Sequence, residues 1–204
     1  MDDFNELAKV WDDKPRRVNM AKVIANEIVK KVPNLTKMTG LDCGCGTGLL
    51  SFNLYNNLKH ITLADNSSGM LKVLKEKITK FKISNMTPVN IDLSNDPVFD
   101  NSFDIIYSSM VLHHIDNIED LLNTFYKFLN SSGYICIADL SKEDGSFHEC
   151  EFNVHKGFEK DSLVNMLKKS GFNNINWDIC YEVKKQIKNG EEKSFPVFFV
   201  TAQK

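Results

Sequence analysis

The stretch Leu41-Asp-Cys-Gly-Cys-Gly-Thr-Gly48 decides the fold expected for this chain. An apolar segment at 38–43 is predicted to lead into it as a strand, and residues 49–58 are predicted to follow as a helix. Its three glycines can take positive φ and let a ligand approach the backbone closely. Free amides at the start of a helix favour a carboxylate or a phosphate. The stretch therefore predicts a ligand-binding loop at the carboxyl end of a parallel strand.

The spacing within the loop argues against two phosphate-binding patterns. A dinucleotide loop needs a third small residue, and counting from Gly44 that position is the bulky Leu49. A Walker loop needs a Gly-Lys-Ser/Thr run, and none follows. A nicotinamide-dependent oxidoreductase thus stays open only as a less favoured alternative.

Outward from the loop, strands and helices alternate. This alternation, with short loops and apolar strands, predicts a parallel sheet covered on both faces. The capping pair Asp116 and Glu119 is expected to open the second helix of the series. The predicted strands are 60–64, 86–91, 103–109 and 134–140, and the predicted helices are 68–81 and 117–129.

The two ends of the chain differ from this alternation. Residues 4–31 are predicted to be an amphipathic helix, broken near Pro15 and ended by Pro33. After a helix at 160–169, strands at 173–183 and 195–202 flank the turn signal Asn189-Gly190, which predicts an antiparallel hairpin. We expect one domain, 1–204, with an N-terminal helical cap at 1–36 and a sheet core at 37–204.

Two carboxylates follow the next two strands. Asp65 ends the second strand and can accept both hydroxyl groups of a ribose, and Asp92 ends the third, where it can accept from an adenine amino group. Together with the loop, these carboxylates predict a ligand that contains adenosine and has a charged tail other than a diphosphate. S-adenosyl-L-methionine meets that description.

The motif at 41–48 resembles the first motif of the class I methyltransferases, and the resemblance continues through Asp65, Asn90-Ile-Asp92 and Phe103–Ser109. It covers roughly residues 38–140. It implies an α/β, Rossmann-like sheet of seven strands in the order 3-2-1-4-5-7-6, with strand 7 antiparallel and helices on both faces. It also implies S-adenosyl-L-methionine as cofactor and S-adenosyl-L-homocysteine as product.

Carried over by position, the resemblance implies a role for each cofactor-binding residue. Gly44 and Gly46 would line the methionine moiety, and Asp65 and Asp92 would hold the ribose and the adenine. Asp42 would order the loop and help to hold the ammonium group, and Ser108, expected after the fourth strand, would lie beside the methyl donor. The full expected set is Asp42, Gly44, Cys45, Gly46, Gly48, Asp65, Asn66, Asp92, Leu93 and Ser108.

Methyl transfer from a sulfonium is an in-line displacement, for which positioning alone can supply much of the rate. His113 and His114 lie just beyond the fourth strand and are the candidate catalytic residues, as a general base or in positioning the acceptor. No metal is expected, because the spacing of His148, Cys150 and His155 matches no zinc pattern.

Weaker resemblances concern 144–148, 154–159 and Trp11–Val18, which are similar to segments of small bacterial-type methyltransferases of unassigned substrate. We hypothesise that Trp11 and the pair Arg16 and Arg17 close over the charged cofactor.

The composition of the chain limits the classes of partner that it is expected to bind. The formal net charge is −2, and no basic stripe with interleaved aromatic residues is present, so no nucleic acid is expected. No apolar run is long enough to span a bilayer, and the first residues do not read as a signal peptide. Five scattered cysteines suit a reducing cytoplasm. The prediction is O- or N-methylation of a small-molecule acceptor by a cytoplasmic monomer or homodimer. The alternative is a cofactor-binding regulatory or assembly protein without transferase activity.

Overall fold

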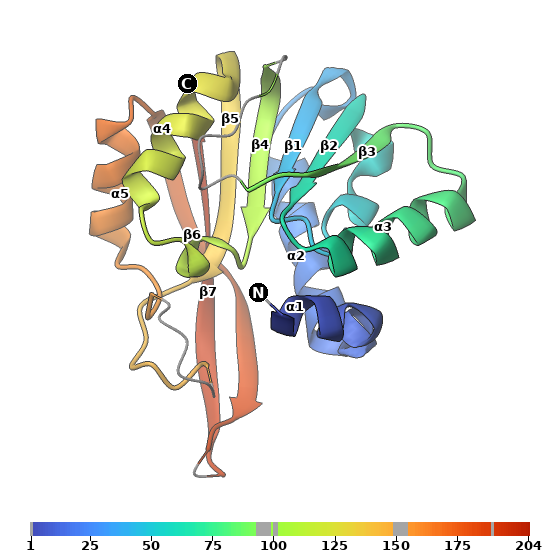
Figure 1. Ribbon diagram of the computed structural model, residues 1–204. Coiled ribbons are helices and arrows are strands. Elements are labelled where there is room, and N and C mark those ends of the chain that lie inside the picture. The colour runs from blue at the N-terminus through green and yellow to red at the C-terminus, as the bar shows by residue number, and fades with distance from the viewer. Residues whose placement is uncertain (1, 93–98, 100–101, 149–154, 189) are drawn as a thin grey trace.

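A seven-stranded sheet organises the chain (Figure 1). The computed structural model describes residues 2–92, 99, 102–148, 155–188 and 190–204. The strands are β1 (Thr39–Cys43), β2 (His60–Asp65), β3 (Met86–Asn90), β4 (Phe103–Ser109), β5 (Leu129–Leu140), β6 (Asn173–Gln186) and β7 (Glu192–Gln203). Their order in the sheet is β3-β2-β1-β4-β5-β7-β6. This is the order and architecture that the resemblance implied.

Strand directions also agree with the expectation. β1 pairs in parallel with both β2 and β4, and the pairs β2–β3 and β4–β5 are parallel as well. β7 runs antiparallel to both of its neighbours, β5 and β6. The β6–β7 hairpin extends past the ends of the other strands (Figure 1). Its predicted turn residue Asn189 lies outside the described residues.

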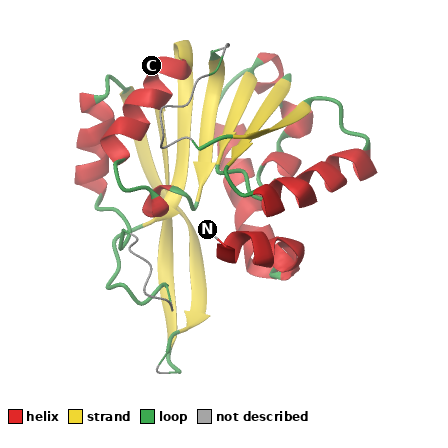
Figure 2. Cartoon of the chain, in the orientation of Figure 1, coloured by secondary structure: helices red, strands yellow, loops and turns green. Residues whose placement is uncertain are grey.

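Helices cover both faces of the sheet (Figure 2). The α-helices are α1 (Asp2–Leu7), α2 (Pro15–Lys31), α3 (Ser68–Phe81), α4 (Ile118–Phe128) and α5 (Lys160–Lys169). Short 3-10 segments are η1 (Ala8–Asp13), η2 (Leu35–Lys37), η3 (Ser51–Asn53), η4 (Tyr55–Asn57) and η5 (Leu112–His114). Within the part of the chain that is described, no helix combines the length and the apolar character that crossing a bilayer requires.

Two apolar clusters, one on each face, hold the layers together. On one face α2, α3 and the η3–η4 segment pack onto the sheet through residues such as Ile28, Leu74 and Leu54. On the other face α4 and α5 pack through Phe125, Leu163 and their neighbours. Because side chains alternate along a strand, β7 contributes Phe199 to the first cluster and Phe198 to the second.

The helix predicted at 49–58 is wrong. The structure has only the 3-10 segments η3 and η4 there. The segment contains three asparagines and a serine, whose side chains compete for backbone hydrogen bonds and are weak helix formers. Asn53 shows this competition, since its Nδ2 donates to the carbonyl of Leu49 at 2.8 Å.

The capping pair predicted for α4 is also wrong. Asn117, not Asp116, is the N-cap residue, and its side-chain oxygen accepts from the backbone amide of Asp120 at 3.2 Å. The strand predicted at 134–140 begins earlier, because residues 129–133 are also part of β5, with a register shift against β4 and a positive φ of 63° at Ser132. The bounds of α3 and α5 are confirmed as predicted.

Candidate active site

The glycine loop follows β1, and its three glycines differ in how much space surrounds them. Gly44, Gly46 and Gly48 all have positive φ, at 68°, 53° and 85°. A Cβ atom at Gly44 would overlap the side chain of Val111, and one at Gly48 would lie 2.7 Å from Leu74 Cδ1. At Gly46 the nearest atom would be Met70 Sδ, 4.0 Å away. Packing therefore requires glycine at 44 and 48, whereas Gly46 borders open space where a ligand can approach the backbone.

Asp65, at the end of β2, ties the glycine loop to the start of α3. One carboxylate oxygen accepts from the amide of Gly46 at 2.7 Å, and the other accepts from the amide of Ser67 at 2.8 Å. Burial raises the pKa of Asp65, and these backbone amides partly oppose the rise. Each carboxylate oxygen has two lone pairs, so both can still accept from a hydroxyl group. The geometry suits the predicted ribose contact.

The other residues expected around the adenosine lie along the same edge of the sheet. Asn66 follows Asp65 and is exposed. Asp92 follows β3, whose last residue, Asn90, is paired with Asp65 in the sheet register. Asp92 is half-buried there. Leu93 lies outside the described residues.

Asp42 is placed differently from the expectation. Its carboxylate is 2% exposed and accepts from Ser51 Oγ at 2.6 Å, while Ser51 Oγ also contacts Tyr107 OH at 2.7 Å. Burial raises the pKa of Asp42 to about 7. The side chain thus secures the backbone after the loop from inside the core, which supports the ordering role and not the ammonium contact.

Ser108 requires a correction too. It lies within β4, whose bounds match the strand predicted at 103–109, and not after that strand. It is 1% exposed, and its Oγ donates to the carbonyl of Cys43 at 3.1 Å. Its hydroxyl group fixes β4 against the end of β1. Cys45 is also buried, in the core cluster that contains Leu74.

Sequence reasoning missed two side chains of the N-terminal segment, one of which binds the glycine loop and the other the start of α3. Asp12 accepts from Thr47 Oγ1 at 2.5 Å and from Lys77 Nζ at 2.7 Å. Asn5 accepts at 2.7 Å from the amide of Gly69, in the first turn of α3. These residues are 35 to 65 positions apart in the chain, so no local pattern could reveal the contacts.

The expected lid residues pack partly on each other. The guanidinium of Arg17 lies 3.4 Å from the ring centre of Trp11 and donates to its carbonyl. Trp11 in turn contacts Phe4, which meets the ring of His114 edge-on at 5.6 Å. The segment therefore reaches both the glycine loop and His114, one of the two candidate catalytic histidines.

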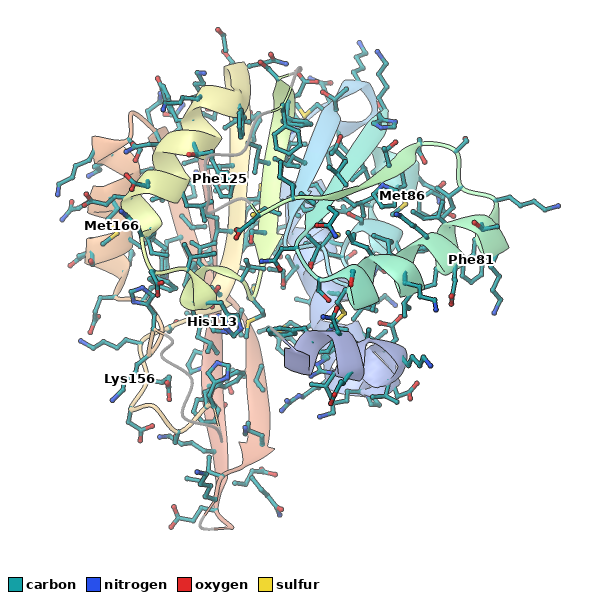
Figure 3. The ribbon with its side chains drawn as sticks, in the orientation of Figure 1. Phe81, Met86, His113, Phe125, Lys156 and Met166 are labelled. Atoms are coloured by element: carbon teal, nitrogen blue, oxygen red, sulfur yellow. The ribbon has the colours of Figure 1, made fainter. Side chains whose placement is uncertain are left out.

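His113 and His114 lie beside the carboxyl end of β4, where Figure 3 labels His113. The carboxylate of Asp139, in β5, lies 2.6 Å from His113 Nδ1, and both side chains are buried. Because a carboxylate only accepts, Nδ1 is the donor in this contact, and Nε2 is the nitrogen left for other partners. Asp139 was missed, although an acidic residue in the apolar run Ile135–Leu140 is a recognisable signal.

A third ring joins the pair. His148 lies 5.1 Å from His113 and 5.5 Å from His114, measured between ring centres. Burial, together with the neighbouring His113, lowers the pKa of His114 and of His148 to about 4 each. All three rings come from segments that follow β4 or β5, so the structure places an imidazole cluster at the same edge of the sheet as the glycine loop.

Comparison with known proteins fits this geometry. Residues 41–137 match the family described as "Methyltransferase domain". A methyltransferase of Schizosaccharomyces pombe with no assigned substrate is 30% identical over 169 residues, which cover 74% of this chain. The chain spans 60% of that relative's length.

Two solved structures share the fold. A SAM-dependent methyltransferase from Aquifex aeolicus superposes with a TM-score of 0.71 at 18% identity, covering 98% of this chain and 97% of its own. Phosphoethanolamine N-methyltransferase 2 of Haemonchus contortus, solved with S-adenosyl-L-methionine, has a TM-score of 0.71 at 19% identity. It is covered over 52% of its length, with 88% of this chain.

Proposed function

We propose that the chain is a class I S-adenosylmethionine-dependent methyltransferase and that it methylates a small-molecule acceptor on oxygen or nitrogen. The cofactor of this family is S-adenosyl-L-methionine. Support for a small acceptor comes from the shared fold of phosphoethanolamine N-methyltransferase 2 of Haemonchus contortus.

The observation that carries the proposal is the pairing of Gly46 with Asp65. The backbone at Gly46 is open where a side chain would otherwise stand, and the Asp65 carboxylate lies against it with lone pairs to spare. A cofactor with a ribose and a charged, non-phosphate tail fits a carboxylate next to an open glycine. We assign the ribose to Asp65, the adenine end to Asn66, Asp92 and Leu93, and the methionine end to residues 44–46.

When bound, the cofactor supplies an activated methyl group and a thioether leaving group. The protein's task is to hold the acceptor in line with that group, and pre-arranged geometry of this kind is worth up to about 7–11 kcal/mol of barrier. We place the acceptor on the side of His113 and His114. The Asp139–His113 contact fixes the orientation of the His113 ring, so that its Nε2 is an acceptor atom of defined position.

We further propose that residues 4–13 cover the bound cofactor. Asp12 holds Thr47 of the glycine loop, and Asn5 holds the first turn of α3 next to Asp65. Both contacts lie on elements assigned to the cofactor. Opening and closing of this segment would then control entry and release.

Calorimetric titration with S-adenosyl-L-homocysteine tests the proposal. We expect the wild-type chain to bind it and to gain thermal stability from it, and to gain none from NAD. Asp65→Asn should weaken binding by about 10- to 100-fold, because a hydrogen bond to a charged group is worth about 1.5–3 kcal/mol. Deleting residues 1–13 should weaken it as well.

An exposed acid remote from the loop provides the matched control. Asp116→Asn should leave the affinity unchanged. Stabilisation by NAD in place of S-adenosyl-L-homocysteine, or equal affinity in the Asp65 and Asp116 variants, would overturn the assignment of the site. Unchanged affinity in the variant that lacks residues 1–13 would contradict only the proposal that residues 4–13 cover the cofactor, and would leave the assignment of the site in place.

A further inference from the structure

The imidazole cluster is built from two separate segments of the chain. His113 and His114 belong to η5, and His148 follows β5. One ring nitrogen of each histidine lies within 4.8 Å of one ring nitrogen of each of the other two. A tetrahedral zinc site with metal–nitrogen bonds of about 2.1 Å sets its nitrogen ligands about 3.4 Å apart. The three nitrogens would have to draw closer together to reach that spacing.

The surroundings of His113 match those of a metal ligand. Asp139 accepts from His113 Nδ1 at 2.6 Å, and its two oxygens are also held by the amides of His113 and Leu140, at 3.3 and 2.7 Å. A carboxylate behind a ligating histidine fixes the ring, selects the tautomer and raises the basicity of the other nitrogen. With Nδ1 engaged by Asp139, Nε2 is the nitrogen of His113 that is left to bind a metal.

His148 supplies an independent observation. Its Nε2 atom is inaccessible to solvent and has no hydrogen-bond partner among the described residues. A buried polar atom without a partner is rare and calls for an explanation such as an ion. The ring of His114 reaches solvent, which leaves an entry path for a metal.

We propose that His113, His114 and His148 bind one divalent transition metal, with Zn²⁺ as the preferred ion and at least one coordination position open. Three imidazole ligands with a remaining open position are the ligand set of catalytic and not of structural zinc sites. Occupation would engage Nε2 of His113, so that this atom could not also serve as a general base. The proposal stands on the cluster alone and does not require methyl transfer.

The test is metal binding by the untagged full chain after treatment with a chelator. We expect one equivalent of Zn²⁺ per chain in competition with a chromophoric chelator. His148→Ala and His114→Ala should each weaken the affinity at least about 100-fold, and Asp139→Asn about 10- to 100-fold. His60→Ala is the matched control, because His60 starts β2 and contacts Thr87 instead of the cluster.

Cobalt distinguishes this site from binding to thiols. The Co²⁺ complex should show d–d bands of a four- or five-coordinate ion and no thiolate-to-cobalt charge-transfer band, since no cysteine belongs to the proposed set. Because His114 reaches solvent, its variant should fold even if the His148 variant does not. Stoichiometric binding that survives both histidine substitutions would overturn the proposal, and so would a thiolate band. A dissociation constant for Zn²⁺ weaker than the micromolar range would overturn it as well.

Discussion

At the scale of single residues, the hydrogen-bond partner of Asp42 is not the one that was expected. It sits in the core with Ser51 as its hydrogen-bond donor, and burial raises its pKa to about 7. The ordinary value for an aspartate in an unfolded chain is about 3.9. Between these two values the folded protein keeps a proton that the unfolded chain has lost.

The sign of the resulting pH dependence follows from linkage. Because the folded state binds more protons in this range, the free energy of unfolding falls as the pH rises from about 4 to about 7, and then levels off. Asp42→Asn removes this titration. We expect the loss of stability between about pH 5 and about pH 8, seen in urea unfolding, to shrink by roughly 3 kcal/mol in the variant.

Ser51→Ala is the matched comparison. It removes the hydroxyl donor that opposes the rise of the Asp42 pKa, so the fall in stability should continue to a higher pH. Equal slopes in the wild type and in both variants would show that Asp42 does not titrate in this range.

The position of a site residue could be predicted only where it follows directly from the end of a strand. Asp65 and the glycines follow strands, so their place at one edge of the sheet could be deduced from the alternation of elements. The contact of Asp12 with the loop and that of Asn5 with the start of α3 depend on residues far away in the chain, and the partner of Asp42 depends on how the segment after the loop folds back. Periodicity and turn signals carry no information on such contacts.

At the scale of elements, the start of α4 provides a direct test of a corrected prediction. Asn117 caps the helix through the amide of Asp120, whereas the expected cap, Asp116, makes no such bond. Asn117→Ala should lower the free energy of unfolding by about 1 kcal/mol. Asp116→Ala, an exposed neighbour, should change it by less than about 0.5 kcal/mol. The midpoints of urea unfolding of the two variants measure this difference. A larger loss of stability in the Asp116 variant would show that Asp116 is the N-cap residue after all.

Elements with strong periodicity and clear ends were predicted well. α3 and α5 have apolar stripes and match their expected bounds. The segment at 49–58 has apolar residues at similar intervals, but its asparagines favour local side-chain bonds over a continuous helix. A short apolar pattern without good helix formers is therefore compatible with 3-10 turns packed on a sheet.

At the scale of the whole molecule, β7 joins the two layers. Phe198 is fully buried and stacks on Trp177 at 4.0 Å between ring centres, and Phe199 points into the opposite cluster. Phe198→Ala should cost about 3–5 kcal/mol in the free energy of unfolding. Ile179→Ala, opposite Phe198 on β6 but 52% exposed, should cost less than about 1 kcal/mol. Chemical unfolding of both variants measures the difference, and similar losses would contradict this view of the core.

The place of β7 also has a consequence for synthesis. This strand is the last of the seven to leave the ribosome, yet it lies between β5 and β6. Until it emerges, the nascent chain presents the edge of β5 as an unpaired row of amides and carbonyls, and such edges invite association with other chains. Chaperones that shield nascent polypeptides would therefore be needed most during translation of the final hairpin.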